Sequence, residues 1–161
     1  MAARPITSEV QSLGTVDAVR RLVAGVRVIS DFKVIDQPTI DTFAQLTRDF
    51  NWIHVDPQRA ARESPYQSTV AHGLLTLALT ATFYEQCFRF PGQKLSLNYG
   101  FNRVRFVNAV PTNSRVRGAF QLDDVHTVAQ DAIRCTWGVE LEIEGQQKPA
   151  LVAEWLVQMY F

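Results

Sequence analysis

Asp49 and His54 lie five positions apart in a polar stretch, residues 47–57, and their side chains could carry out acid–base chemistry. An imidazole titrates near pH 6.5, so it can accept and donate a proton close to neutral pH. A carboxylate and an imidazole that meet at one point can hold a water molecule, remove one of its protons and return a proton elsewhere. A helix-end carboxylate and a hydrogen-bonded loop histidine fit the same spacing, so the spacing alone leaves both interpretations open.

A second cluster, Ala71-His72-Gly73, comes directly before the most apolar segment of the chain. The first turn of a helix exposes N–H groups that have no intrahelical acceptor and carry a partial positive charge. Because Gly73 has no side chain, a ligand carbonyl could approach these groups, which would stabilise an oxyanion or an enolate. An equally good explanation is that Gly73 relieves crowding where the helix meets other elements.

Arg103 and Arg105 form a third candidate site on a predicted strand. Residues two apart on a strand point to the same face. Two guanidinium groups on one face suit the binding of phosphates. A solvated basic face, or ion pairs with acidic residues on a neighbouring strand, would explain the same pattern.

Three helices are expected to position these clusters. Asp36-Gln37-Pro38 is a helix start, and apolar residues at helical spacing predict a helix over about 38–48. A short helix over 57–62 begins with a proline. The third helix, over 72–89, is apolar on almost all sides in its first turns, which is typical of a buried helix, and Pro91-Gly92 ends it.

The second half of the chain is predicted to form β-strands, because apolar and polar residues alternate from Lys94 onward. Turn signals divide it into four long strands and fall at Pro111-Thr112-Asn113, Asp123-Asp124 and Glu144-Gly145. Strands joined by tight turns pair in the antiparallel direction. One buried helix followed by such strands predicts an α+β fold in which the sheet wraps around the helix.

The composition fits a single globular domain. The 161 residues are 47% hydrophobic and 20% charged, and 16 basic residues balance 16 acidic ones. No overall field attracts nucleic acid or an anionic membrane, so neither is expected as a partner. We expect one domain over residues 1–161, with an N-terminal helical extension over residues 1–30.

Cysteine usage and the N-terminal sequence predict a cytoplasmic protein. Cys87 and Cys135 are far apart and lack metal-binding spacing, so free thiols in a reducing compartment are expected. The N-terminus lacks the apolar region of a signal peptide. The longest apolar stretch, residues 73–83, is too short to span a bilayer.

Together the three clusters resemble the MaoC-like dehydratase family, and in particular its (R)-specific enoyl-CoA hydratases, over about residues 38–161. The hydratase motif is an aromatic residue, a spacer, Gly-Asp-x-Asn-Pro-aliphatic-His and a small residue further on. The matching residues here are Phe43, Asp49, Asn51, Ile53, His54 and Ala60. Further matching segments are Val55-Asp56-Pro57, Ala71-His72-Gly73, Asn98-Tyr99-Gly100 and Val104-Arg105-Phe106. Several motifs in the right order are more specific than any one of them.

Two positions depart from the hydratase motif. Arg48 replaces the glycine before the aspartate, and Trp52 replaces the proline after the asparagine. The bulk and charge of Arg48 could alter specificity or reduce activity. Its side chain could instead bind a phosphate of coenzyme A.

The resemblance implies a single hot-dog fold, in which an antiparallel sheet wraps around a long central apolar helix, and a homodimer. It implies (R)-specific hydration of trans-2-enoyl-CoA to (R)-3-hydroxyacyl-CoA, and the reverse dehydration. Asp49 would accept a proton from water, and His54 would deliver a proton to the α-carbon of the acyl-CoA thioester substrate. No cofactor and no metal are expected, because coenzyme A is part of the substrate.

The resemblance also assigns supporting roles. Asn51 would orient the catalytic groups, and the N–H of Gly73 would stabilise the thioester oxygen. Candidates for binding the substrate or its coenzyme A moiety are His72, Arg103, Arg105 and Arg48. Candidates for lining an acyl tunnel are Leu75, Leu79, Phe83 and Phe101.

Two other functions remain as alternatives. Hot-dog acyl-CoA thioesterases commonly place a catalytic carboxylate on the central helix, where this chain has only Glu85, near the far end. A catalytically weak acyl-CoA binding protein is the second alternative, and Arg48 is the feature that favours it.

Overall fold

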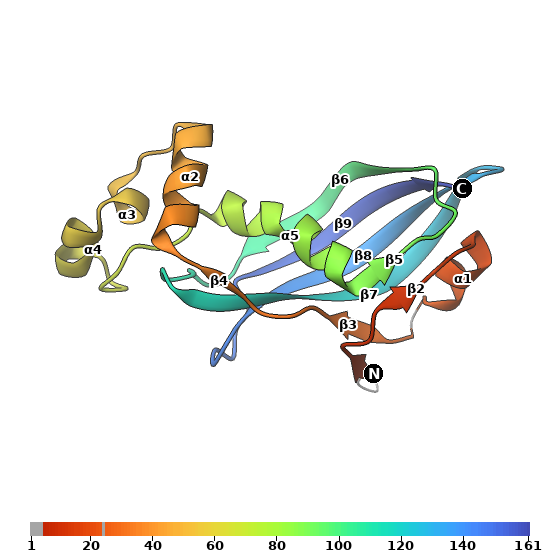
Figure 1. The fold of residues 1–161 in the computed structure, drawn as a ribbon, viewed down its shortest axis with the longest axis horizontal. Helices are drawn as coiled ribbons and strands as arrows, with labels where there is room; N and C mark the ends of the chain where they lie inside the picture. The colour runs from red at the N-terminus through yellow and green to blue at the C-terminus, as the bar shows by residue number, and fades with distance from the viewer. Residues whose placement is uncertain (1–4, 24) are drawn as a thin grey trace.

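The computed structural model describes residues 5–23 and 25–161. One long helix, α5 (Gly73–Cys87), lies lengthwise against a face of an antiparallel sheet (Figure 1). The long strands of that sheet are β6 (Leu95–Phe106), β7 (Ser114–Ala129), β8 (Ala132–Ile143) and β9 (Leu151–Tyr160). The predicted α+β arrangement, with a long apolar helix against an antiparallel sheet, is confirmed.

The long strands occupy the order β7-β8-β9-β6, and short strands extend the sheet beyond β7. The short strands are β1 (Ile6–Thr7), β3 (Arg27–Ile29) and β4 (Lys33–Ile35). Both β3 and β4 pair with β7, and β1 pairs with β3. At the other edge, β6 pairs with β9 alone among the described strands. One edge of β6 is therefore free to hydrogen bond with another chain.

The prediction of a helical N-terminal extension over residues 1–30 is wrong for the described part of that segment. Only α1 (Val16–Arg21) is helical there, while β1, β3 and β2 (Gln11–Ser12) are strands; residues 1–4 and 24 lie outside the described residues. β2 pairs with β5 (Phe88–Arg89) directly after α5. Tertiary pairing explains the difference, since Val28 of β3 is buried and lies opposite Phe120 of β7.

The predicted turn at Asp123-Asp124 is also wrong. Both residues lie within β7, where the register with β8 shifts between Leu122 and Asp124. A β-bulge absorbs one extra residue without ending a strand, so the polar pair does not reverse the chain. The hairpin between β7 and β8 turns at Gln130-Asp131 instead.

Three short helices gather beyond the N-terminal end of α5, away from both termini (Figure 1). They are α2 (Gln37–Thr47), α3 (Trp52–Val55) and α4 (Pro57–Glu63). The predicted helices over 38–48 and 57–62 correspond to α2 and α4, whereas α3 was not expected. Asp36 caps α2 by accepting a hydrogen bond from the N–H of Thr39 at 3.0 Å. The polar stretch, residues 47–57, runs from the end of α2 through α3 to the start of α4.

The core lies between α5 and the sheet. The ring of Tyr84, on the buried side of α5, packs against five aromatic rings, which belong to Phe88, Phe90, Phe120, Trp137 and Trp155. The other side of α5 is exposed to solvent, and 61% of the surface of Leu74 on that side is exposed. None of the described helices is long and apolar enough to cross a membrane.

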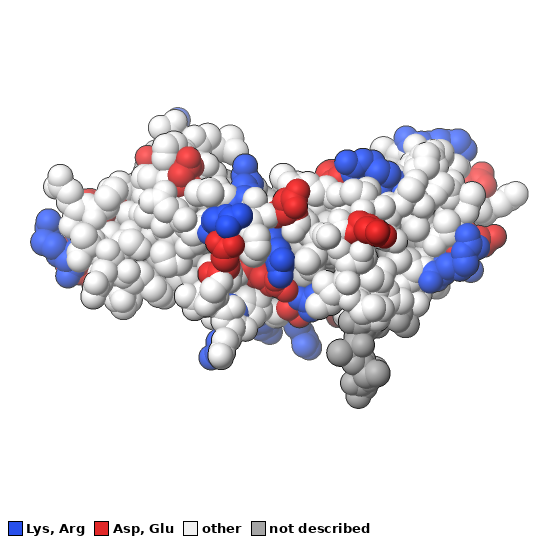
Figure 2. All heavy atoms as spheres, turned by 60° about the horizontal axis from the view of Figure 1, so that its bottom comes forward, with Lys and Arg blue, Asp and Glu red and all other residues white. Residues whose placement is uncertain are grey.

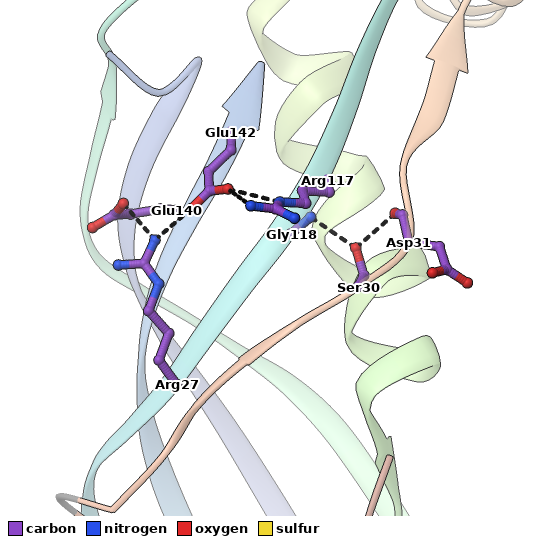
Figure 3. A network of polar contacts seen from close by, with 7 residues as sticks. All are labelled: Arg27, Ser30, Asp31, Arg117, Gly118, Glu140 and Glu142. Carbon is purple, nitrogen blue, oxygen red and sulfur yellow. Dashed lines mark hydrogen bonds and ion pairs between the residues drawn. The ribbon is translucent and has the colours of Figure 1, made fainter. Parts of the chain in front are cut away.

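Ion pairs hold the N-terminal segment to the sheet. Figure 2 shows acidic and basic side chains side by side across the middle of one face. The guanidinium of Arg27 in β3 lies 2.7 Å from Glu140 and 2.9 Å from Glu142 of β8, and Arg117 of β7 also contacts Glu142 (Figure 3). The Ser30 hydroxyl accepts a hydrogen bond from the N–H of Gly118. These contacts join the segment before α2 to the domain.

Candidate active site

The structure brings together Asp49, His54 and His72 beside the N-terminal end of α5. One carboxylate oxygen and one ring nitrogen from each histidine all lie within 4.8 Å of one another. The Asp49 side chain is 54% exposed, His54 is half-buried and His72 is buried. The arrangement therefore has an open acidic side and a closed side formed by imidazoles.

Asp49 and His54 are positioned by a compact turn between α2 and α3. The Asp49 carboxylate accepts a hydrogen bond from the N–H of Asn51 at 3.3 Å. The Asn51 side chain in turn accepts from the N–H of Ile53 at 3.3 Å and so caps α3, which carries His54. Asn51 therefore stabilises the turn that holds Asp49 and His54, and it influences their orientation only through this turn.

The ring of His54 is fixed by the main chain of the segment before α5. Its Nδ1 lies 2.7 Å from the carbonyl oxygen of Val70. A carbonyl can only accept, so Nδ1 carries the hydrogen, and Nε2 of the neutral ring keeps its lone pair. Burial lowers the pKa of His54 and the neighbouring His72 lowers it further, while the Val70 carbonyl and Asp49 oppose this shift. Neutral His54 is therefore a proton acceptor at Nε2.

His72 packs beneath both of these residues. Its Nε2 donates a hydrogen bond to the main-chain oxygen of Asp49 at 3.0 Å. Its ring stacks on His54, with centroids 3.8 Å apart, and the ring of Phe43 lies 5.1 Å away. Only 2% of His72 is exposed, and its predicted role in binding substrate or coenzyme A stays a prediction. Its sequence pattern could not reveal this burial.

Gly73 begins α5, as predicted, and the helix receives no hydrogen bond from a capping side chain. A Cβ at Gly73 would lie 3.1 Å from the ring of Phe106 in β6. This close approach supports the explanation that Gly73 relieves crowding. A hollow of about 280 Å³ lies beside the helix start, and Tyr66, Gly73, Thr76 and Phe106 are among its lining residues. Donation from the N–H of Gly73 to a thioester oxygen stays a prediction.

A second hollow, of about 210 Å³, follows the exposed side of α5 along β6. We call it the apolar groove; its lining includes Leu74, Leu77, Ala78, Ala81, Phe101 and Trp155. Of the predicted tunnel residues, Phe101 lines this groove. Leu75 and Phe83 face the opposite side of α5 and are buried in the core, so they do not line it. The side of α5 on which a residue lies determines whether it lines the groove or the core. The sequence could not show this, because α5 is apolar on almost all sides.

The arginine candidates are all exposed. Arg103 and Arg105 lie on β6, and the residue after them, Phe106, packs over the start of α5. Arg48 lies at the end of α2, directly before Asp49. No contact in the structure assigns a ligand to any of the three, and their phosphate-binding role stays a prediction.

Gln37 is a supporting residue that the sequence did not point to. Its side-chain amide donates a hydrogen bond to the carbonyl of His54 at 2.8 Å and accepts one from the Thr69 hydroxyl at 2.5 Å. It thereby ties α2, α3 and the segment before α5 to one another. A glutamine in the first turn of a helix has many ordinary explanations, so no signal in the sequence could have identified it.

The three site residues have the chemical types of metal ligands, but their hydrogen bonds favour another use. Nδ1 of His54 and Nε2 of His72 each donate to a main-chain carbonyl. The remaining nitrogen of His72, Nδ1, is buried. A tetrahedral metal site needs imidazole lone pairs that converge on one open point. Asp49 and Nε2 of His54 are better suited to hold a water molecule.

Comparisons with known proteins agree with this combination of fold and site. Residues 14–142 match the family described as the MaoC like domain. Nodulation protein N of Rhizobium meliloti is 44% identical over 133 residues, which are 82% of this chain and 83% of that protein. The 3-hydroxyacyl-thioester dehydratase Z of Mycobacterium tuberculosis is 43% identical over 129 residues, 80% of this chain and 85% of that one.

A solved structure, described as the (R)-hydratase from A. caviae involved in PHA biosynthesis, matches with a TM-score of 0.66 at 24% identity. The match covers 81% of this chain and 92% of that one, and it supports the hot-dog fold. The chain is thus a hot-dog protein with a polar site at the start of its central helix. It belongs to the MaoC-like dehydratase family, and its dehydratase relative identifies its enzyme class as a hydro-lyase.

The backbone explains why the family motif has glycine where this chain has Arg48. Arg48 ends α2 in the left-handed conformation, with φ 61° and ψ 23°, which glycine adopts without a steric penalty. The replacement of glycine by Arg48 therefore places a residue that disfavours this conformation at the end of α2. It does not require the arginine side chain to enter the site. Trp52 occupies the first position of α3, where proline is common, and its ring packs under the guanidinium of Arg59.

Arg48→Gly is expected to make the protein more stable by about 0.5–1 kcal/mol. A left-handed conformation costs a non-glycine residue roughly 1–2 kcal/mol, and the greater freedom of glycine in the unfolded chain offsets part of this gain. Chemical denaturation of both proteins measures the difference. Equal or lower stability of the variant would mean that the Arg48 side chain makes a stabilising contact.

Proposed function

We propose that the protein catalyses the (R)-specific hydration of trans-2-enoyl-CoA to (R)-3-hydroxyacyl-CoA, and the reverse dehydration. The observation that carries this proposal is the convergence of the Asp49 carboxylate with the imidazole of His54, whose Nε2 keeps a free lone pair. These two groups can hold a water molecule between them. The reaction moves a proton and a hydroxyl group only, so it needs neither a redox cofactor nor a metal.

The tautomer of His54 suggests which residue takes the proton of the water molecule. Asp49 accepts a hydrogen bond from the water and orients it. As the water oxygen attacks the β-carbon, Nε2 of neutral His54 takes a proton and then delivers it to the α-carbon on the same face. This scheme gives the first proton transfer to His54, whereas the family resemblance led us to expect Asp49 in that role. The hydroxyl ends on the β-carbon and the proton on the α-carbon, so the addition is balanced.

The start of α5 is proposed to stabilise the negative charge that forms on the thioester oxygen. The N–H groups in the first turn of α5 receive no capping side chain. Gly73, the first residue of the helix, lines the hollow of about 280 Å³ described above. A preorganised donor of this kind contributes about 3 kcal/mol to the stability of an oxyanion-like transition state. The acyl chain would lie in the apolar groove, and Arg103, Arg105 and Arg48 are proposed to bind the phosphates of coenzyme A.

We also propose that two copies form a homodimer through β6. This strand has twelve residues and one free edge in the described structure. Leu95, Leu97 and Tyr99 are each more than 40% exposed along it. Pairing of two such edges would satisfy their main-chain groups and cover these side chains.

The position of Glu85 argues against the thioesterase alternative. Glu85 lies twelve residues after Gly73 in α5, which places it about 18 Å along the helix from the site. A carboxylate at that distance cannot act on a thioester bound at the helix start.

The experiment that tests the proposed function follows crotonyl-CoA and longer trans-2-enoyl-CoAs by the ultraviolet absorbance of the conjugated thioester. A thiol reagent in a parallel assay detects free coenzyme A, and chiral analysis identifies the product. Loss of conjugation without thiol release, with an (R)-3-hydroxyacyl product, is the expected result. Thiol release would favour a thioesterase, and tight binding without turnover would favour an acyl-CoA binding protein.

Activity is expected to fall on the acid side with an apparent pKa below 6.5, the ordinary value for histidine. Protonated His54 has no lone pair at Nε2, and burial of His54 lowers its pKa in the folded protein. The same lowered pKa means that His54 favours folding above pH 6.5, and that this contribution is lost as the pH falls through the pKa of the folded state. The profile of kcat/KM against pH reports the free enzyme. An acid limb at or above 6.5 would contradict the assignment.

A further inference from the structure

His72 contacts both proposed catalytic residues, although its side chain is buried. The hydrogen bond from its Nε2 fixes the main chain of Asp49, and its ring covers one face of the His54 ring at an interplanar angle of 28°. Phe43 packs against His72 at an interplanar angle of 53°. The ring of His72 thus packs against both Phe43 of α2 and His54 of α3.

These contacts leave His72 little freedom to move. It is the residue directly before α5, and its carbonyl accepts hydrogen bonds from the N–H groups of Leu75 and Thr76 in the first turn of that helix. The position of the imidazole is therefore set by the helix start. Movement of this ring would displace the Asp49 carbonyl and remove the surface on which His54 rests.

We propose that His72 is a positioning residue for the hydration: its Nε2–H holds the Asp49 loop, and its ring sets the plane of His54. This inference rests on the proposed function, because the geometry that it preserves is that of the water-binding pair. The hydrogen bond is the stronger constraint, since it is directional and acts directly on the residue that holds the water. A misplacement of about 1 Å in such a site can reduce the rate by roughly 10²-fold.

Two substitutions separate the two contacts. His72→Gln keeps a side-chain N–H at nearly the position of Nε2 and removes the ring. His72→Phe keeps a ring that can stack on His54 and removes the donor. His126→Gln is the matched control, because His126 is an exposed residue of β7 that contacts none of the site residues described above.

We expect His72→Phe to lower kcat by roughly 10²-fold, with KM changed by less than about threefold, because the reacting groups are misplaced and no substrate contact is lost. His72→Gln should retain kcat within about tenfold of the wild type, and His126→Gln should match the wild type. Unchanged kcat in folded His72→Phe would overturn the proposal. A rise in KM alone, in either His72 variant, would also overturn it by pointing to a substrate contact.

A second measurement does not depend on turnover. His54 is faced by His72 and Asp49, and NMR of the unliganded protein can follow the titration of its ring. His72 lowers the pKa of His54, so His72→Phe is expected to move this titration to higher pH. Absence of hydration by the wild type would refute the proposed function. An unchanged His54 titration and ring signal in His72→Phe would refute the contact between the two histidines, whatever the wild type catalyses.

Discussion

Asp49→Asn is expected to lower kcat for hydration of trans-2-enoyl-CoA by roughly 10²- to 10⁴-fold, the usual contribution of a positioned acid–base group. Asparagine has nearly the same shape and keeps an oxygen that can accept the hydrogen bond from the N–H of Asn51. It lacks the negative charge that, in the proposed mechanism, orients the water and stabilises a proton on His54. The turn between α2 and α3 should therefore persist while catalysis is lost. Initial rates at saturating substrate measure the effect.

The control for this substitution is Asp131→Asn, which removes the same charge from an exposed turn between β7 and β8. That turn lies at the end of the molecule opposite α2, α3 and α4 (Figure 1). The control should retain wild-type kcat. Because the Asp49 side chain is 54% exposed, thermal unfolding of Asp49→Asn should differ little from that of the wild type. A folded Asp49→Asn protein with normal turnover would remove Asp49 from the mechanism.

His54→Asn is expected to reduce kcat by a similar factor, roughly 10²- to 10⁴-fold. The side-chain amide of asparagine can occupy the position of Nδ1 and donate to the carbonyl of Val70, so the connection to the segment before α5 is kept. It has no group that can accept the water proton in the place of Nε2. The loss should therefore appear in kcat, while binding of a saturated acyl-CoA, which cannot react, should be little changed.

Circular dichroism and thermal unfolding establish whether His54→Asn is folded. The measurement that decides its role is kcat compared with the affinity for butyryl-CoA, determined by calorimetry on the wild type and the variant. If the variant lost affinity and kept kcat, His54 would bind substrate and would not transfer protons. If both quantities were unchanged, the lone pair at Nε2 would have no part in the reaction.

Much of the fold could be predicted because local signals and tertiary packing agree. Asp36 and Pro38 mark the start of α2, and the alternation of apolar and polar residues marks the long strands. Prediction failed where a non-local contact decides the outcome. The pair Asp123-Asp124 resembles a turn, yet pairing of β7 with β8 carries the strand past it through a bulge. β3 is a strand because its residues pair with β7.

The site shows the same division. The motif identified Asp49 and His54, and the structure brings their side chains together. The sequence could not show that His72 is buried beneath them, because histidine before an apolar helix fits an exposed ligand contact equally well. Nor could it show that Arg48 adopts a left-handed conformation until the helix end was located. Burial and backbone angles depend on the packed chain, whereas residue type and spacing are present in the sequence.

The central claim is that Asp49 and His54 act as a unit on one water molecule, and kcat of the double variant Asp49→Asn/His54→Asn tests it most directly. Residues that act as a unit are strongly non-additive, so removal of the second costs little once the first is lost. The wild type should hydrate crotonyl-CoA, and the double variant should have about the kcat of the slower single variant. A kcat lower by the product of the two single losses would show that the residues act independently. That result would contradict the shared water molecule on which the proposed mechanism rests.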